Sequence, residues 1–319
     1  MNKELLLESR PVIAVVTTPE MLAQVDIESL RNQYDVQLIE RSAISGEELL
    51  EILNPCIDIL INYDCCRERT APILYALSLK GIRAISVDMT GVEWINSDAA
   101  IKLGIQIFSV SNYCTDSVSE HIIAEILLHA HRIHQSYMDI IDGGIPVNRK
   151  GWLLKCKTVG ILGLGNIGKR VAEILTGFGC QIIGWNRTST EFSGEYFADS
   201  EEVISNAQIL ILALKTVPDT VGFLSKKRLK MLPSGAIVIN QMSLEIIDQE
   251  ALFSLLISKH IGGYSAPRGG TEGQAIRNTN LVTYLPANAW YCEESQKNLT
   301  YRWVENLRFG LPMYRSENS

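Results

Sequence analysis

Residues 158–175 read TVGILGLGNIGKRVAEIL, and this stretch decides the fold of the chain. A β-branched run leads into Gly163-x-Gly165-x-x-Gly168, and apolar side chains then recur at helical spacing over 167–175. Glycines in this pattern permit a tight turn and a close approach of the backbone to a pyrophosphate, and a helix that begins there offers N–H groups to phosphates. The stretch therefore predicts a strand, a turn and a helix that bind a dinucleotide. The alternative is a tight turn that holds no ligand.

Short apolar runs alternate with amphipathic segments on both sides of this stretch. The runs have the β-branched composition of strands buried in parallel sheets, and their alternation with helices is typical of doubly wound folds. We therefore predict an α/β protein with two parallel-sheet lobes joined by long helices, one of them at about 118–140. Ser45 is expected to cap a helix, with Glu48 three residues later. The expected strands are 12–17, 36–39, 57–61, 83–87 and 105–110, then 158–162, 181–185, 209–214, 236–240 and 281–284.

The composition is that of an ordinary globular protein. The 319 residues are 46% hydrophobic and 20% charged, which is ample material for a buried core. The formal charge of −7 argues against nucleic acid or an anionic membrane as a partner, and no apolar run is long enough to span a bilayer. The first ten residues, MNKELLLESR, show no secretory signal, and the seven cysteines are scattered without a CxxC pair. We therefore expect a cytoplasmic protein with free thiols and no metal site.

The strand that follows the glycine helix bears on the choice of cofactor. An acid at its end would bind the ribose 2′-hydroxyl of NAD(H), but the sequence there is Asn186-Arg187-Thr188. Asparagine does not repel a 2′-phosphate and Arg187 can pair with one, so NADP(H) is favoured. NAD(H) stays open, because asparagine also bonds a ribose hydroxyl and Arg187 has the alternative of stacking on adenine or staying solvated. The residues expected at the cofactor are Gly163, Gly165, Asn166, Ile167, Gly168, Asn186, Arg187, Thr188, Ala213, Leu214 and Asn240.

Four stretches resemble D-isomer-specific 2-hydroxyacid dehydrogenases, most closely the D-lactate dehydrogenase branch that includes VanH-type vancomycin-resistance enzymes. They are ISVDMTGVEWINSDAAIKLGIQIFSV (85–110), SVSEHIIAEILL (117–128), TVGILGLGNIGKRVAEILTGFG (158–179) and LPANAWY (285–291), and the resemblance covers about 55–312. It implies a flavodoxin-like substrate lobe formed by 1–120 with 292–319, and a Rossmann nucleotide lobe formed by 121–291. It also implies a small-molecule substrate, ligands bound in the cleft between the lobes, and a homodimer formed through the nucleotide lobe.

The family's three catalytic side chains do not all stand in this sequence. The resemblance implies an Arg that binds the substrate's carboxylate and carbonyl in a segment IN-x-x-R-G, but the matching position is Ser243. It implies a His general acid/base in a segment T-P-H-x-A-W/F-Y, but the matching position is Ala287. The Glu that orients this His matches Glu272 in an ungapped register from Ile261, beside Pro267-Arg268-Gly269 in place of the usual D-V-F/Y.

These replacements remove chemistry that the family's reaction needs. Serine cannot replace a bidentate guanidinium against a carboxylate, and alanine donates no proton to a developing alkoxide. Loss of general acid–base help alone typically costs about 10² to 10⁴ in rate. We therefore expect Ser243 and Ala287 to exclude the family's usual reaction at useful speed.

Several other side chains are candidates for a rebuilt substrate pocket. Tyr291 is a candidate proton donor and Arg268 a candidate replacement cation, with plain packing as the alternative for the tyrosine. His131 and His134 have a spacing that suits a metal, but without a carboxylate at i+4 a packed or solvated role is expected. The pair Cys65-Cys66 follows the third strand and is a candidate reactive thiol site, with an inert role as the alternative. The residues expected to line the pocket are Thr90, Gly91, Val92, Tyr113, Arg268 and Asn288, with plain loop packing as the alternative for the first four.

Three functions are compatible with this sequence. The first is an NADP(H)- or NAD(H)-dependent oxidoreductase with altered substrate or mechanism, because a complete cofactor loop stands beside altered catalytic positions. The second is a catalytically silent cofactor-binding sensor or scaffold, because the Arg and the His are lost together. The third is a residual 2-oxo acid reductase that uses Arg268 and Tyr291 as substitutes.

Overall fold

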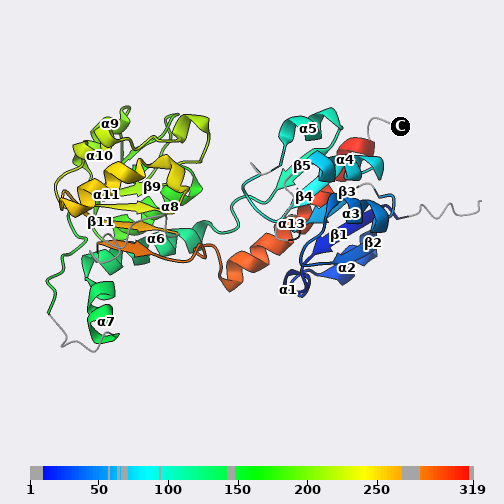
Figure 1. The fold of residues 1–319 in the computed structure, drawn as a ribbon, viewed down its shortest axis with the longest axis horizontal. Coiled ribbons are helices and arrows are strands. Elements are labelled where there is room, and N and C mark those ends of the chain that lie inside the picture. The colour runs from blue at the N-terminus through cyan, green and yellow to red at the C-terminus, as the bar shows by residue number, and fades with distance from the viewer. Residues whose placement is uncertain are drawn as a thin grey trace, which may run out of the picture. The chain divides into compact units, whose positions relative to one another are not determined.

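The computed structural model describes residues 10–56, 58–62, 65, 71–92, 95–141, 148–267 and 281–315. The chain divides into two compact units, each built around its own parallel sheet (Figure 1). Unit 1 comprises residues 1–113 and 293–319, and unit 2 comprises residues 114–292. Among the described residues, no helix combines the length and apolar composition needed to cross a bilayer.

Unit 1 contains a five-stranded parallel sheet of order β2-β1-β3-β4-β5, the doubly wound order of flavodoxin-like folds. Buried side chains of α3, α4 and α5 cover one face, and α2 and α13 pack on strands of the sheet. The cap predicted at Ser45 is confirmed, since its Oγ accepts a hydrogen bond from Glu48 N at 3.1 Å. The strands are β1 (Val12–Thr17), β2 (Asp35–Glu40), β3 (Asp58–Ile61), β4 (Ala84–Val87) and β5 (Gln106–Ser109), and the helices are α1 (Pro19–Leu22), α2 (Ile27–Gln33), α3 (Gly46–Ile52), α4 (Ala71–Leu79), α5 (Ser97–Lys102) and α13 (Glu293–Arg315).

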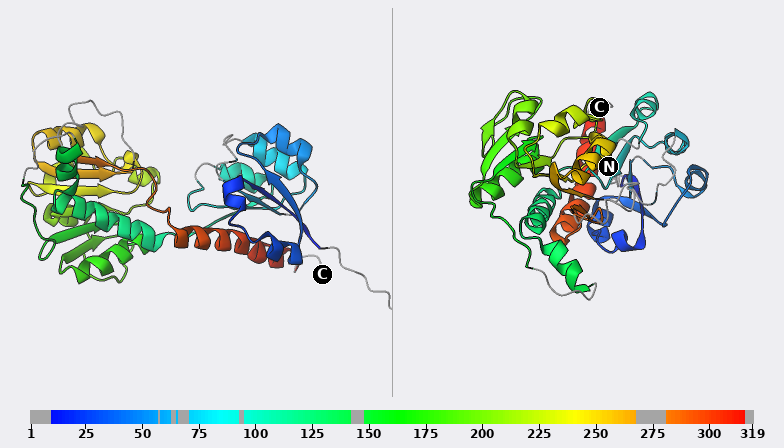
Figure 2. Two further views of the ribbon diagram at one scale, coloured as in Figure 1. Left: turned by 90° about the horizontal axis from the view of Figure 1, so that it is seen from below. Right: turned by 60° about the vertical axis from the view of Figure 1, so that its left-hand side comes forward.

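The last helix, α13, belongs to unit 1 and packs on β4 and its neighbours β3 and β5 (the orange and red helix in Figure 2). Trp303 is fully buried, and its Nε1 donates to Ser86 O at 2.8 Å. Ser86 Oγ donates to Trp303 O at 2.9 Å, and Asn306 Nδ2 donates to Ser86 Oγ at 3.1 Å. These bonds satisfy a buried serine on β4 and fix the register of α13 against the sheet.

Unit 2 contains a seven-stranded parallel sheet of order β12-β11-β10-β9-β6-β7-β8. Taken in chain order, the strands are arranged as in dinucleotide-binding Rossmann folds, with the reversal between β6 and β9. The strands are β6 (Thr158–Leu162), β7 (Gln181–Trp185), β8 (Glu195–Tyr196), β9 (Ile209–Leu212), β10 (Ala236–Asn240), β11 (Ile261–Ala266) and β12 (Val282–Tyr284). The helices are α6 (Thr115–Ala130), α7 (Ile133–Ile141), α8 (Asn166–Gly177), α9 (Ser200–Asn206), α10 (Lys226–Met231) and α11 (Gln249–Ile257), with 3₁₀ turns η2 (Pro218–Thr220) and η3 (Leu244–Ile246).

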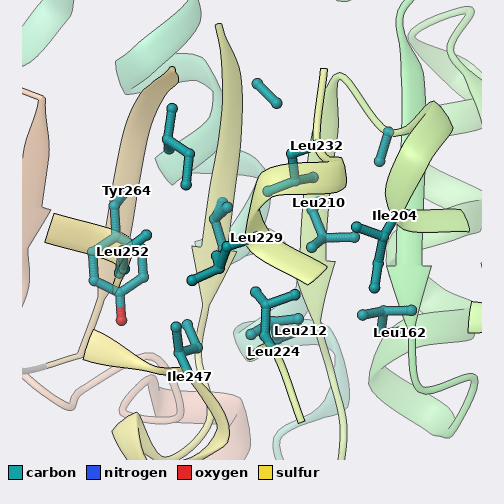
Figure 3. Close-up of a cluster of buried hydrophobic side chains, with 14 of the residues drawn as sticks. Leu162, Ile204, Leu210, Leu212, Leu224, Leu229, Leu232, Ile247, Leu252 and Tyr264 are labelled. Carbon is teal, nitrogen blue, oxygen red and sulfur yellow. The ribbon is translucent and has the colours of Figure 1, made fainter. Parts of the chain in front are cut away.

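Two buried clusters cover the two faces of this sheet. Side chains of α9, α10 and α11 pack on one face, where Leu162, Leu210, Leu212, Leu224 and Tyr264 lie together (Figure 3). Side chains of α6 and α8 pack on the other face. With helices on both faces, the strands show the continuous apolar runs expected of a buried parallel sheet.

The predicted α/β architecture with two doubly wound sheets is confirmed, and one predicted element is wrong. The single helix expected at 118–140 is two helices, α6 and α7, because the chain leaves the helix at His131 and Arg132. Arg132 has a φ of 55°, a left-handed conformation that ends a right-handed helix. The strands β8 and β11 were not predicted. In β11 the glycines at 262 and 263 dilute the apolar pattern on which strand prediction depends.

Candidate active site

The glycine turn between β6 and α8 forms an open cradle. Gly163 has a φ of 101°, and a Cβ added there would lie 2.5 Å from Ala213 O. A Cβ on Gly168 would lie 2.1 Å from Gly163 O, so both positions require glycine. Gly165 is exposed with no atom within 4 Å of an added Cβ, and no side chain among the described residues caps the helix that it begins. The turn therefore fits a pyrophosphate, which would meet main-chain N–H groups and the positive end of the α8 dipole.

The loop after β7 is tied to this turn through Asn186. Asn186 Oδ1 accepts from Leu164 N at 3.2 Å, and its Nδ2 donates to Thr188 O at 3.1 Å. An uncharged amide thus occupies the place where NAD-dependent folds carry an acid. The next side chain, Arg187, is 74% exposed, and its Nη1 lies 3.8 Å from Asp219 Oδ2. Such an exposed pair is weak, so the guanidinium is available to a ligand phosphate.

The turn after β10 uses Ser243 as a structural residue. Asn240 is fully buried, and its Oδ1 accepts from Met242 N at 2.9 Å, which fixes the turn. Ser243 Oγ then accepts from Glu245 N at 3.2 Å, so this side chain caps η3. The hydroxyl at the position matched to the family's Arg is engaged with the backbone, and it supplies no positive charge.

The segment that leads out of β12 carries Ala287 and Tyr291. Ala287 is exposed, and its methyl group cannot transfer a proton. The Ser117 hydroxyl of α6 donates to Ala289 O, which fastens this segment to unit 2. Trp290 packs against the α6–α8 cluster and meets Tyr291 edge-on with ring centroids 5.2 Å apart. Tyr291 is itself exposed, which is compatible with contact to a ligand.

A row of buried polar side chains lies on the face of α6 that packs on the sheet. Glu125 is fully buried, and neither carboxyl oxygen has a hydrogen-bond partner among the described residues. Burial raises the pKa of Glu125 to about 8, against a smaller lowering by the neighbouring Gln241 side chain. One turn further, burial lowers the pKa of His129 to about 4. His129 Nε2 lies 3.0 Å from Ser265 Oγ, and Gly263 leaves room for the ring, since a Cβ there would lie 2.7 Å from Nδ1.

The carboxyl edge of the unit 1 sheet carries a second polar group. The Asn62 side chain donates to the Asp88 carboxylate, and both residues are buried. Cys65 is fully buried with its thiol directed at Arg41 O, 3.0 Å away, which does not match the exposure of a reactive thiol. Thr90 Oγ1 donates to Val110 O at 2.8 Å and so anchors its own loop.

Comparison with known proteins identifies the nucleotide-binding part. Residues 123–266 match the model of the D-isomer specific 2-hydroxyacid dehydrogenase NAD binding domain. This part of the chain therefore has the NAD binding domain of D-isomer specific 2-hydroxyacid dehydrogenases. It is 29% identical over 260 residues to a D-specific alpha-keto acid dehydrogenase of Enterococcus faecium, which covers 75% of this chain and 79% of that protein.

Two further proteins show how far the resemblance extends. A D-lactate dehydrogenase of Curvularia clavata is 29% identical over 196 residues, 60% of this chain but only 56% of the length of that relative. The structure of an acyclic imino acid reductase in complex with NADPH and D-Arg is similar, with a TM-score of 0.79 and 22% sequence identity. The alignment covers 95% of this chain and 97% of that one. The family is one of NAD-binding oxidoreductases, and the structural likeness extends across both units.

The structure brings most of the residues predicted to bind the cofactor to the carboxyl edge of the unit 2 sheet. They stand in the turns after β6, β7, β9 and β10, and Gly163 touches Ala213 directly. The candidates Thr90, Gly91, Val92 and Tyr113 belong to unit 1, whereas Asn288 and Tyr291 belong to unit 2. The described residues do not include the candidates Cys66, Arg268 and Glu272.

Sequence reasoning missed the buried acid on α6. Positions 118, 122, 125 and 129 follow the 4-3-4 spacing of one helix face, and all four are buried. Glu125 and His129 therefore stand in an apolar stripe, which is the signal that would have found them. Among the described residues, no group of three or more His, Cys, Asp or Glu side chains is placed to hold a metal ion.

Proposed function

We propose that this protein is a nicotinamide-dependent oxidoreductase that acts on a small molecule by a route other than the family's Arg, Glu and His. The observation that carries the proposal is an intact phosphate cradle at Gly163, Gly165 and Gly168 in a chain with Ser243 and Ala287 at the matched catalytic positions. When bound, a nicotinamide cofactor supplies or accepts a hydride. The chain's own residues hold its phosphates and ribose through the turns after β6 and β7. Without a guanidinium at 243, the pocket favours a substrate less acidic than a 2-oxo acid.

The preferred cofactor in this proposal is NADP(H). Asn186 presents a neutral side chain beside the glycine turn, and Arg187 presents an exposed guanidinium next to it. A 2′-phosphate placed there gains a charge-assisted partner and meets no carboxylate at 186. The imino acid reductase of similar fold was solved with NADPH, so the fold accommodates this cofactor.

Titration calorimetry with NADPH and NADH tests the cofactor assignment. Arg187→Ala should weaken NADPH binding about 10- to 100-fold, because a hydrogen-bonded charge contributes about 1.5–3 kcal/mol. NADH lacks the 2′-phosphate, so its affinity should stay unchanged and serves as the internal control. Asn186→Asp should shift the preference toward NADH by repelling the 2′-phosphate. If neither cofactor binds the wild type at millimolar concentration, the cradle argument fails; tighter NADH binding would refute only the NADP(H) preference.

A catalytically silent cofactor sensor is the second candidate. It is favoured by the capping role of Ser243, which leaves the position committed to local structure, and by the absence of a proton donor at Ala287. Oxidation of NADPH in the presence of a panel of 2-oxo acids distinguishes the silent sensor from an active reductase of these acids. Turnover that is abolished by Arg268→Ala would support a residual 2-oxo acid reductase instead. If the wild type is silent and the double variant Ser243→Arg, Ala287→His reduces 2-oxo acids, the matched positions are correct.

We also propose that the protein forms a homodimer through α7. Ile133, Tyr137, Ile140 and Ile141 are all exposed and recur at i, i+4, i+7 and i+8, so they form one apolar stripe on the helix. Contiguous exposed apolar surface of this kind marks interaction sites, and a second copy covers it with the same stripe. Light scattering after size-exclusion chromatography should give a dimer that Ile140→Lys dissociates. Ile101→Lys alters an exposed isoleucine in unit 1 and should leave the dimer intact; a monomeric wild type would contradict the proposal.

A further inference from the structure

A pocket of about 670 Å³ opens at the amino end of β11, away from the glycine turn. Because all strands of the unit 2 sheet are parallel, this end lies at the edge opposite to the turns that carry the cofactor residues. The volume is within the range of small-molecule sites. Its apolar lining comes from Leu256, Ile257, Ile261 and Leu281. The pocket is therefore large enough for an organic ligand and separate from the candidate active site.

The rim of this pocket is strongly basic. Arg132, Arg149, Lys150 and Lys259 line it, and no acidic side chain is among the lining residues that the structure describes. Arg149 is held by Asp139 through two hydrogen bonds of 2.8 and 2.9 Å, which fixes the guanidinium in place. Because Asp139 balances the charge of Arg149, the excess positive charge at this hollow comes from Arg132, Lys150 and Lys259, in a chain with a formal charge of −7. Such a concentration attracts anions.

Two of these cations occupy positions where glycine is the usual residue. Arg132 and Lys259 have φ values of 55° and 60°, and each follows the end of a helix, α6 or α11. Side chains in this left-handed conformation are strained, and such strain clusters at functional sites. A cation near a helix carboxyl end does interact favourably with the helix dipole, but the dipole accounts neither for Lys150 nor for the hollow that all three residues line.

We propose that this pocket binds an amphiphilic organic anion, in which a phosphate or carboxylate is joined to an apolar body. The rim cations would pair with the anionic group, and Leu256, Ile261 and Leu281 would cover the apolar body. Neither the rim cations nor the apolar walls alone would bind a ligand tightly. The cations would hold a small inorganic anion only weakly, and the apolar walls offer no directional contact. The ligand's charge makes its binding depend on salt, because exposed ion pairs are screened.

Titration calorimetry on the full chain saturated with NADPH tests this site with octyl phosphate as the probe. Octyl phosphate should bind at least tenfold more tightly than inorganic phosphate and than the neutral octyl glucoside, and its affinity should fall as sodium chloride is raised. Saturation with NADPH closes the glycine turn to the probe, so binding reports on the second pocket. Absence of octyl phosphate binding, or affinity equal to that of either partial probe, would overturn the proposal.

Three variants locate the binding. Lys259→Gly relieves the left-handed strain, so the melting temperature should hold or rise while octyl phosphate affinity falls roughly fivefold. Lys150→Glu reverses one rim charge and should weaken binding roughly tenfold. Lys230→Glu reverses an exposed charge on α10 outside the pocket and should leave binding unchanged. An equal loss in all three variants would show nonspecific charge attraction and refute the site, whereas loss of NADPH binding in the wild type would refute only the proposed function.

Discussion

Replacing Glu125 with glutamine should remove a fall in stability that the wild-type protein shows on the alkaline side of neutrality. The carboxyl group is fully buried on α6, and burial raises its pKa from 4.5 to about 8 in the folded state. Its ionised form is therefore disfavoured by the fold. Glutamine keeps the shape of the protonated acid but does not ionise, so the variant isolates the effect of this one titration.

The sign and size of the effect follow from the two buried titrating groups on the helix. Stability from Glu125 is fully present below pH 4.5 and is lost as the pH rises toward about 8. His129, whose pKa falls from 6.5 to about 4, acts in the opposite sense and adds stability as the pH rises between those values. The contributions of Glu125 and His129 to the pH dependence of stability nearly cancel between pH 4.5 and 6.5. From pH 6.5 to 8 only Glu125 acts, so the free energy of unfolding should fall by about 2 kcal/mol, at about 1.36 kcal/mol per pH unit.

Urea titrations at pH 6.5, 7.0, 7.5 and 8.0, followed by tryptophan fluorescence, measure this difference. Trp152, Trp185 and Trp290 lie in the same unit as Glu125, so their emission reports its unfolding. Glu120→Gln is the matched control, because Glu120 is an exposed glutamate on the same helix and should keep the wild-type slope. A pH slope in Glu125→Gln equal to that of the wild type would refute the argument that this carboxyl group is protonated at neutral pH.

Three further substitutions test the geometry of unit 2. Gly168→Ala places a Cβ 2.1 Å from a backbone carbonyl and should abolish NADPH binding in calorimetry, whereas Gly177→Ala, with open space around it on the same helix, should leave the cofactor bound. Gly263→Ala drives a methyl group to 2.7 Å from His129 Nδ1 and should lower the free energy of unfolding by about 1–3 kcal/mol in urea; an unchanged value would mean that the ring is free to move. Ser243→Ala removes the cap of η3 and should cost about 1 kcal/mol, and no loss would argue against its capping role.

The glycine turn of the candidate site could be predicted from the sequence because its conformational requirements are local. The glycines at 163, 165 and 168 are spaced by the geometry of one turn, and the structure shows a close contact at 163 and at 168 and an open position at 165. The strand and helix that flank the turn were equally predictable, since their periodicity depends on neighbours in the chain. The helix break at Arg132 was not predictable, because arginine carries no local signal for a left-handed backbone.

The sequence by itself determined the alternation of strands and helices, the glycine turn between β6 and α8, and the identities of Ser243 and Ala287. Only the tertiary structure decided that Ser243 caps η3, that Glu125 is buried beside Gln241, and that cations from three separate segments line one pocket. The reason is that spacing along the chain encodes periodicity and turn geometry, whereas burial and charge environment depend on segments that meet only when the sheet assembles.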